Sequence, residues 1–327
     1  MKIKISYDII LYIIFAFCAS NFFVGKERIL ELVDFGSESG LSYVAVRYDG
    51  AYDLQKTLEC GQCFRWERVE DSQHECEYVG VAYGRLISVA KDGDTLTFYN
   101  ADKEDIENIW IKYFALEEDY GQIDSELLSN CESEVFREAL KLGRGIRILH
   151  QDPWETLCSF IISQNNNIPR IKKIINSLSE SLGERIECAG MESHGGNKAF
   201  YSFPSAASVV SAGEKHIFDL KTGFRAKYII DAAQKWSDGT VDPACAMKIT
   251  ELEEAIEYLC TIKGVGRKVA CCSLLFGFER YDPFPVDVWM KRVLEKYFEA
   301  DFSPTKFGRY AGVAQQYLFD YERNLAQ

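Results

Sequence analysis

Apolar and polar side chains alternate with a period of two in the region that follows residue 41, which predicts short β-strands. Aromatic and β-branched residues are frequent in these segments, and turn residues such as Gly93, which lies between two aspartates, separate them. The predicted strands are residues 41–46, 64–69, 77–83, 86–90 and 95–99. We therefore predict a β-rich N-terminal domain with bounds at residues 41–149.

From Lys103 onward the apolar positions recur every three or four residues, which is the period of an amphipathic helix. The two clearest stripes are Ile106, Ile109, Trp110 and Phe114, followed by Val135, Phe136, Ala139 and Leu140. A helix start is predicted at Asp152, because Pro153 follows at the first position and Glu155 supplies an acid in the first turn. Residues 150–327 are predicted to form a helical body, with a glycine-rich excursion at residues 189–198.

The first 40 residues fit neither pattern. A start that contains two lysines precedes an unbroken apolar run at residues 9–19, and small polar residues follow it. This arrangement is typical of a signal peptide, whereas a membrane span needs about twenty apolar residues. We interpret residues 1–40 as an extension outside the fold, in preference to an export signal.

The charge balance limits the kind of nucleic-acid binding that the chain supports. It has 37 Lys and Arg against 50 Asp and Glu, a net charge of −13, which argues against indiscriminate binding. Basic residues nevertheless cluster at residues 170–173, 221–227 and 263–268. Such clusters on an acidic body predict binding through a few placed contacts.

Eleven cysteines is an odd number, and their spacing matches no disulfide scaffold, so we expect a reduced protein. Cys60 and Cys63 are the one pair with redox or metal spacing. A zinc site needs four ligands and no second pair of this kind is present. We therefore expect these cysteines to pack in the core, and we predict no metal site.

The segment from residue 259 to residue 276 carries the strongest chemical signal. Gly264 and Gly266 lie between two apolar segments and predict a tight turn that a second chain can approach closely. The helix that follows would direct unpaired N–H groups at a phosphate. Lys268 lies at the same turn, and Asp287 lies at the start of a later helix. This combination suggests covalent chemistry on a nucleic acid.

Seven segments together resemble the 8-oxoguanine DNA glycosylase/lyase family of the helix-hairpin-helix (HhH-GPD) superfamily. They are Gly-Gln-Cys-Phe-Arg-Trp (61–66), Gln-Asp-Pro-Trp-Glu (151–155), Ser-Gln-Asn-Asn-Asn-Ile (163–168), Gly-Phe-Arg-Ala-Lys-Tyr (223–228), Gly-Val-Gly-Arg-Lys-Val-Ala (264–270), Pro-Val-Asp-Val (285–288) and Ala-Gln-Gln-Tyr-Leu-Phe (314–319). The resemblance covers residues 42 to 327. It implies an α+β fold, with an antiparallel β-rich, TBP-like domain before a helical glycosylase body.

The resemblance also assigns roles to residues. Lys268 would attack C1′ of the damaged nucleotide and form a Schiff base that permits β-elimination, while Asp287 would stabilise the charge on the sugar. The damaged base would be recognised by Gly61, through its backbone C=O, and by Cys272, Gln315 and Phe319. DNA would be bound by Asn165, Arg170, Phe224 and Arg225, and by backbone groups at Gly264, Gly266 and Val269.

The resemblance also implies a partner, an oligomeric state, a cofactor requirement and a location for the protein. The partner is double-stranded DNA that contains oxidised guanine, and we expect a monomer with no obligate protein partner and no stable membrane association. A monovalent cation at the hairpin is the one cofactor that the resemblance allows. An iron–sulfur cluster is excluded, because no cysteine follows Cys272. The expected location is cytoplasmic, at the bacterial nucleoid.

The chain departs from the family pattern at four positions. Lys263 replaces a proline, which predicts a looser turn, and Trp289 replaces a histidine that touches phosphate. Phe224 replaces a tyrosine, and Cys271 replaces an acid. We therefore predict a weakened preference for cytosine opposite the lesion.

Three alternatives remain open at this point. The first is an endonuclease III-like or alkylbase glycosylase, and the second is a noncatalytic hairpin-helix DNA-binding module, which would need neither Lys268 nor Asp287. The third is a redox role for Cys60 and Cys63.

Overall fold

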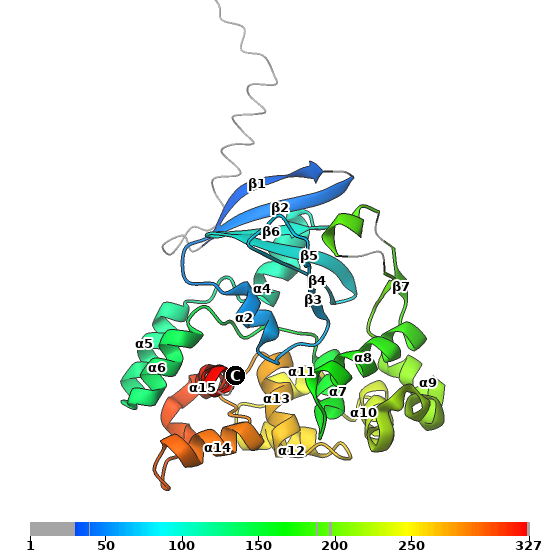
Figure 1. The fold of residues 1–327 in the computed structure, drawn as a ribbon. Helices are drawn as coiled ribbons and strands as arrows, with labels where there is room; N and C mark the ends of the chain where they lie inside the picture. The colour runs from blue at the N-terminus through cyan, green and yellow to red at the C-terminus, as the bar shows by residue number, and fades with distance from the viewer. Residues whose placement is uncertain (1–29, 39, 188, 196–197, 326–327) are drawn as a thin grey trace, which may run out of the picture.

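The computed structural model describes residues 30–38, 40–187, 189–195 and 198–325, and contains an antiparallel six-stranded sheet next to a helical body (Figure 1). The strand order is β1-β2-β6-β5-β4-β3. The strands are β1 (Leu30–Glu38), β2 (Leu41–Tyr48), β3 (Trp66–Arg68), β4 (Cys76–Ala82), β5 (Arg85–Asp92) and β6 (Thr95–Tyr99). The five predicted strands are confirmed as β2 to β6, and the predicted α+β class is confirmed.

Strand β1 corrects the prediction that residues 1–40 lie outside the fold. Leu30–Glu38 pair with β2, from Leu30 opposite Tyr48 to Glu38 opposite Leu41. This strand lies at the edge of the sheet and leaves Val33 and Phe35 exposed, so it lacks the strict alternation of a half-buried strand. The apolar run at residues 9–19 lies outside the described residues.

Helix α2 (Leu54–Glu59) lies between β2 and β3, and the other helices follow the sheet, as the change in period predicts. The first of these are α3 (Lys103–Asp105), the π-helical turn η1 (Ile106–Trp110), α4 (Ile111–Tyr113), α5 (Tyr120–Asn130) and α6 (Glu134–Gly143). Trp110 and Phe114 of the first predicted stripe are buried beside Phe98 of β6. The first stripe thus attaches the helices to one face of the sheet.

The remaining helices form the body that the sequence predicts. They are α7 (Pro153–Ser163), α8 (Ile168–Leu182), α9 (Ala206–Ile217), α10 (Ala226–Ser237), α11 (Pro243–Lys248), α12 (Leu252–Cys260), α13 (Arg267–Gly277), α14 (Val288–Tyr297) and α15 (Ala311–Leu325). Short helical turns η3 (Phe218–Thr222), η4 (Gly223–Arg225) and η5 (Pro304–Tyr310) join them. Asp152 caps α7, as predicted, by accepting the N–H of Glu155 at 2.8 Å. None of the described helices is long and apolar enough to cross a membrane.

Helix α7 lies in the core of the body, because eight of its eleven residues are buried and most of these are apolar. Helix α13 packs against it, and Phe160 of α7 stacks on Phe276 of α13 with ring centroids 5.4 Å apart. Helices α6 and α15 pack together on another side. Helix α13 is therefore packed into the core. Its N-terminal end reaches the surface, as does the N-terminal end of α14.

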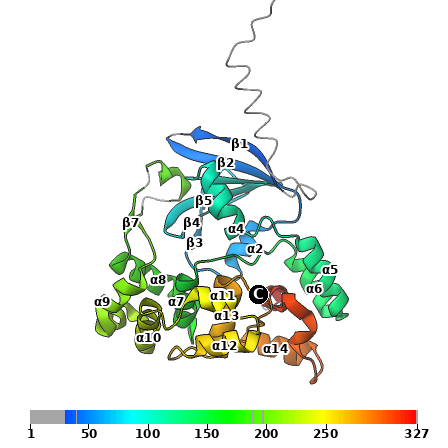
Figure 2. The same cartoon turned by 180° about the vertical axis from the view of Figure 1, so that it is seen from behind.

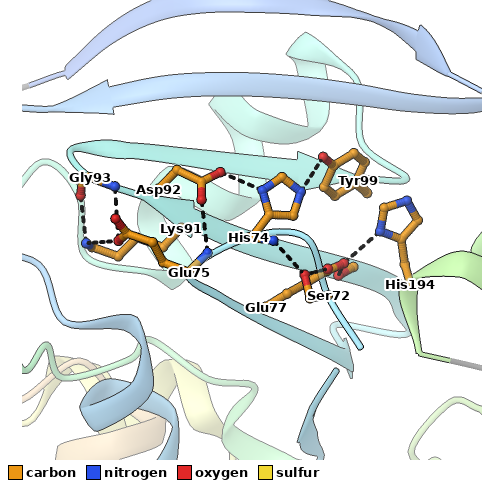
Figure 3. A network of polar contacts seen from close by, with 10 residues as sticks. Ser72, His74, Glu75, Glu77, Lys91, Asp92, Gly93, Tyr99 and His194 are labelled. Carbon is orange, nitrogen blue, oxygen red and sulfur yellow. Dashed lines mark hydrogen bonds and ion pairs between the residues drawn. The ribbon is translucent and has the colours of Figure 1, made fainter. Parts of the chain in front are cut away.

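The predicted excursion lies in the segment between α8 and α9, which runs along the outer face of the sheet (Figures 1 and 2). The turn η2 (Met191–His194) lies within it, and the paired strands β7 (Arg185–Ile186) and β8 (Phe200–Tyr201) flank it. Met191 is buried against the sheet, and His194 Nδ1 lies 2.7 Å from Oε1 of the buried Glu77 (Figure 3). The helical body thus contacts the sheet on this face as well.

Candidate active site

One pocket brings together all six residues that were predicted to act on the base and the sugar. They come from the loop after α2, from α13, from the start of α14 and from α15. The lining residues are Cys60, Gly61, Phe160, Lys268, Cys272, Phe276, Pro285, Asp287, Gln315, Gln316 and Phe319. No role in the pocket was predicted for Cys60, Phe160, Phe276, Pro285 and Gln316; Pro285 and Gln316 lie within matching segments, whereas Phe160 and Phe276 are apolar helix residues with no motif of their own.

Lys268 lies in the first turn of α13 and is partly exposed. Its side chain is hydrogen-bonded to the thiol of Cys272, one helical turn further on. Its Nζ lies 5.3 Å from the ring centroid of Phe160. Burial raises the pKa of Cys272, although the ammonium of Lys268 opposes this shift, so the thiol stays protonated. The amine is therefore held inside the pocket next to a neutral partner.

Asp287 both caps α14 and lines the pocket. Its Oδ1 accepts the backbone N–H of Met290 at 2.8 Å, which fixes the carboxylate at the helix start. Its negative charge also acts on Cys272, whose pKa it helps to raise. Asp287 thus lies near enough to act on a cation that forms beside Lys268.

Three of the four base-recognition residues come from segments other than the helix of Lys268: Gly61 from the loop after α2, and Gln315 and Phe319 from α15. Gly61 adopts φ +86°, which favours glycine, and a Cβ built there would lie 3.9 Å from Cε1 of Phe319. Gln315 is 6% exposed, and its Oε1 is buried without a hydrogen-bond partner among the described residues. A buried amide oxygen without a hydrogen-bond partner is unfavourable unless a ligand donates a hydrogen bond to it. The pocket therefore offers an acceptor for a polar ligand.

The hairpin before α13 has the tight turn that the glycines predict. Gly264 adopts φ +79°, and a Cβ there would lie 2.4 Å from the ring of Tyr228 on α10. A Cβ at Gly266 would meet nothing within 4 Å, so its backbone is open to a ligand. Val269 has a buried side chain, which leaves only its backbone N–H for a phosphate.

At Lys263 the structure shows a contact that the missing proline does not predict. Its backbone N–H donates to Oδ2 of Asp231 at 2.7 Å, a hydrogen bond that a proline cannot make. The turn is therefore fixed from α10.

The residues predicted to handle the DNA strands lie together at the surface near α7, α8 and α10. Asn165 is exposed with φ +48°, Phe224 is 48% exposed, and Arg170 is exposed with no hydrogen bond from its guanidinium to other described residues. Arg225 differs, because it is 2% exposed. Its guanidinium donates to the backbone carbonyls of Gln164, Asn165 and Thr222. These four hydrogen bonds leave one of its five N–H groups for a base.

Cys60 and Cys63 are placed as packing residues. Both are buried, and their thiols donate to the carbonyls of Thr57 and Leu58. Burial, helped by Asp320, raises the pKa of Cys60 to about 12, and burial raises the pKa of Cys63 as well. Thiols that stay protonated are poor nucleophiles and ligands. In the part of the chain that the structure describes, no three His, Cys, Asp or Glu side chains are grouped to hold a metal ion.

Two family models match the chain one after the other. The family model for the 8-oxoguanine DNA glycosylase N-terminal domain matches residues 46–157, and the model for HhH-GPD superfamily base excision DNA repair proteins matches residues 158–308. The Arabidopsis thaliana N-glycosylase/DNA lyase OGG1 is 30% identical over 291 residues, which cover 81% of this chain and 76% of the relative. The chain belongs to the 8-oxoguanine DNA glycosylase family.

Solved structures of the family share the fold closely. MBOgg1, in complex with a low-affinity DNA ligand, is 42% identical with a TM-score of 0.80, covering 91% of this chain and 99% of that one. The Clostridium acetobutylicum 8-oxoguanine glycosylase/lyase is 36% identical with a TM-score of 0.79, covering 91% and 98%. That structure contains double-stranded DNA with cytosine opposite 8-oxoguanine. Family membership thus extends over the sheet and the helical body.

Proposed function

We propose that this protein is a bifunctional DNA glycosylase/lyase that excises 8-oxoguanine from duplex DNA in base excision repair. The observation that carries the proposal is the single pocket that contains Lys268, Asp287, Gly61 and Gln315. An amine, a carboxylate and base-reading groups in one pocket are what excision with Schiff-base formation requires. The names of the family members, N-glycosylase/DNA lyase and 8-oxoguanine glycosylase/lyase, support it.

The reaction begins when the damaged nucleotide leaves the stack and its base enters the pocket. Lys268 gives up a proton, its neutral amine attacks C1′, the bond from C1′ to N9 breaks, and the base departs with the bonding electrons and takes up a proton. The bound nitrogen then loses one proton while O4′ takes one up and the sugar ring opens, which leaves a protonated Schiff base. Loss of a C2′ proton expels the 3′ phosphate. Asp287 stabilises the positive charge on the sugar during the first step.

Recognition of the damaged base depends on the proton that it carries at N7. Oxidised guanine carries an N7–H that guanine lacks, and the C=O of Gly61 accepts it. Gln315 reads the Watson–Crick edge, and Phe319 and Cys272 cover the two faces of the ring. A guanine would place its N7 lone pair against the carbonyl, and an unpaired buried polar group costs about 1–3 kcal/mol.

Residues outside the pocket contact the opposite strand of the DNA. Asn165, Arg170 and the remaining donor of Arg225 contact the unpaired cytosine, and Phe224 fills the gap in the stack. We place the functional division at residues 41–149 and 150–327, with β1 added to the first part. The protein acts as a monomer at the bacterial nucleoid, without an obligate protein partner.

The test is borohydride trapping on a duplex with one 8-oxoguanine opposite cytosine. Wild type is expected to form a covalent adduct that Lys268→Gln does not form, and a guanine duplex is the control. Binding without an adduct would leave a monofunctional enzyme or a noncatalytic hairpin-helix module. An adduct on oxidised pyrimidines alone would favour the endonuclease III-like alternative.

A further inference from the structure

The loop that carries Gly61 is held by a buried glutamine of α15 for which the family motif implies no role. Gln316 of α15 donates its Nε2 to the backbone carbonyl of Cys60 at 3.1 Å. The side chain of Gln316 is 3% exposed, so water does not compete for this hydrogen bond. The peptide group immediately before Gly61 is therefore tied to the helix that also carries Gln315 and Phe319.

The other side of the loop is tied by Gln62. Its Nε2 donates to the carbonyls of Thr57 and Arg147, both at 2.7 Å, and its Oε1 accepts the N–H of Leu149 at 2.9 Å. Its own backbone carbonyl accepts Nε2 of Gln151 at 2.8 Å. With both neighbours fixed, the Gly61 carbonyl has little freedom to move.

Gln315 and Gln316 therefore have different tasks, although they are adjacent and both line the pocket. Gln315 leaves its Oε1 unpaired in the described structure, as expected for a group that awaits a ligand. Gln316 uses its amide donor within the protein. Of the two glutamines, Gln316 is the one that fixes the position of the Gly61 loop relative to α15.

We propose that Gln316 is a positioning residue for base specificity, which keeps the Gly61 carbonyl at the place where it accepts the N7–H of oxidised guanine. The inference rests on the proposed function of the pocket. A hydrogen bond needs a donor–acceptor distance of about 2.7–3.2 Å, so a small shift of the loop removes the contact. Cleavage at an abasic site needs Lys268 but no base, so it depends far less on the loop.

Two variants separate this role from a general packing role. Gln316→Met keeps the length and burial of the side chain but has no donor. Gln316→Glu lacks the donor when ionised and regains one when its carboxyl is protonated, which burial favours. Gln234→Met, at an exposed position of α10, is the matched control.

The experiment compares single-turnover rates on three duplexes, which contain 8-oxoguanine, guanine or a preformed abasic site. For Gln316→Met we expect the ratio of 8-oxoguanine excision to abasic-site cleavage to fall about tenfold, as loss of one hydrogen bond at a recognition contact implies. For Gln316→Glu the ratio should be low at pH 8 and rise toward the wild-type ratio at pH 6. Gln234→Met should keep the wild-type ratio.

A ratio that stays at the wild-type value in a folded Gln316 variant would overturn the inference. So would an equal fall in both activities, because that is the signature of damaged packing. Thermal unfolding shows whether each variant is folded. If Gln316→Met does not fold, the test is the change with pH in the rate ratio of Gln316→Glu. A wild-type protein that cleaves abasic DNA but leaves 8-oxoguanine in place would refute the proposed substrate instead.

Discussion

The backbone N–H of Lys263 and the carboxylate of Asp231 form a hydrogen bond of 2.7 Å that fixes the hairpin. Lys235 adds to it, since its Nζ contacts Asp231 at 2.9 Å and the carbonyl of Thr261 at 2.6 Å. Partial burial acts to raise the pKa of Asp231, but the hydrogen bonds from Lys235 and Lys263 lower it overall. A charged acceptor on α10 thus holds the turn.

Asp231→Ala is therefore expected to weaken DNA binding several-fold, because the hairpin must then be ordered when the phosphate binds. It should also lower the free energy of unfolding by about 1 kcal/mol. Binding is measured by fluorescence anisotropy with a labelled duplex.

The control is Glu257→Ala, an exposed acid on α12. It removes the same negative charge without touching the hairpin, so its affinity should stay equal or rise slightly. Equal affinities for the two variants would contradict a role for Asp231.

The two hairpin glycines should respond differently to alanine. Gly264→Ala places a Cβ 2.4 Å from the ring of Tyr228 at φ +79°, so it should lower the free energy of unfolding by more than about 2 kcal/mol. Gly266→Ala meets no atom within 4 Å and should change stability by less than about 0.5 kcal/mol.

DNA affinity distinguishes them further. Gly266→Ala should bind DNA more weakly while remaining folded, because its methyl group occupies the open space that a phosphate approaches. Urea unfolding and anisotropy titrations measure the two properties. Full affinity in Gly266→Ala would show that no phosphate lies close to this residue.

The two arginines near Phe224, Arg170 and Arg225, have different expected roles. Arg225→Lys removes the guanidinium that holds Gln164 and Asn165, so we expect a loss of about 2 kcal/mol in stability together with poorer discrimination. Arg170→Ala should leave stability unchanged, since its exposed side chain makes no hydrogen bond among the described residues.

Single-turnover excision with cytosine and with adenine opposite 8-oxoguanine measures that discrimination. Wild type should prefer cytosine, though weakly, and Arg170→Ala should reduce the preference further. Equal wild-type rates with the two bases would exclude both arginines as cytosine readers.

The contact between the excursion and the sheet predicts a pH-dependent contribution to stability. Burial acts to raise the pKa of Glu77, but hydrogen bonds from His194, Ser72 and Ser88 outweigh it, so the pKa lies below the ordinary 4.5 (Figure 3). A lowered pKa contributes stability above pH 4.5 that is lost as the pH falls through the folded-state value.

Glu77→Gln is accordingly expected to lower the Tm at pH 7 by an amount that corresponds to about 1–2 kcal/mol. The difference from wild type should shrink as the pH is reduced below 4.5. Glu75→Gln, whose 64% exposed side chain lies in the loop immediately before β4, is the control and should change the Tm little. A Glu77→Gln difference that is constant with pH would contradict the charged pairing.

Local signals explain which parts of the fold could be predicted. The strands β2 to β6 and helix α7 carry alternation, apolar stripes or a complete cap, all of which are visible within about ten residues. Strand β1 was missed because an exposed edge strand needs no strict alternation, and its partner decides that it is a strand. The Gly61 loop was predicted only through a family motif.

The sequence by itself determined the family and the glycines of the hairpin, and through the family motifs it predicted Lys268 and Asp287 as a catalytic pair, because motifs depend on residue types at fixed positions. Tertiary structure decided the rest. It placed the residues from four separate segments in one pocket, paired Lys263 with Asp231, and left Arg225 with a single free donor. These outcomes depend on contacts between residues up to 256 positions apart, such as Gln316 with Cys60, and no local pattern encodes such contacts.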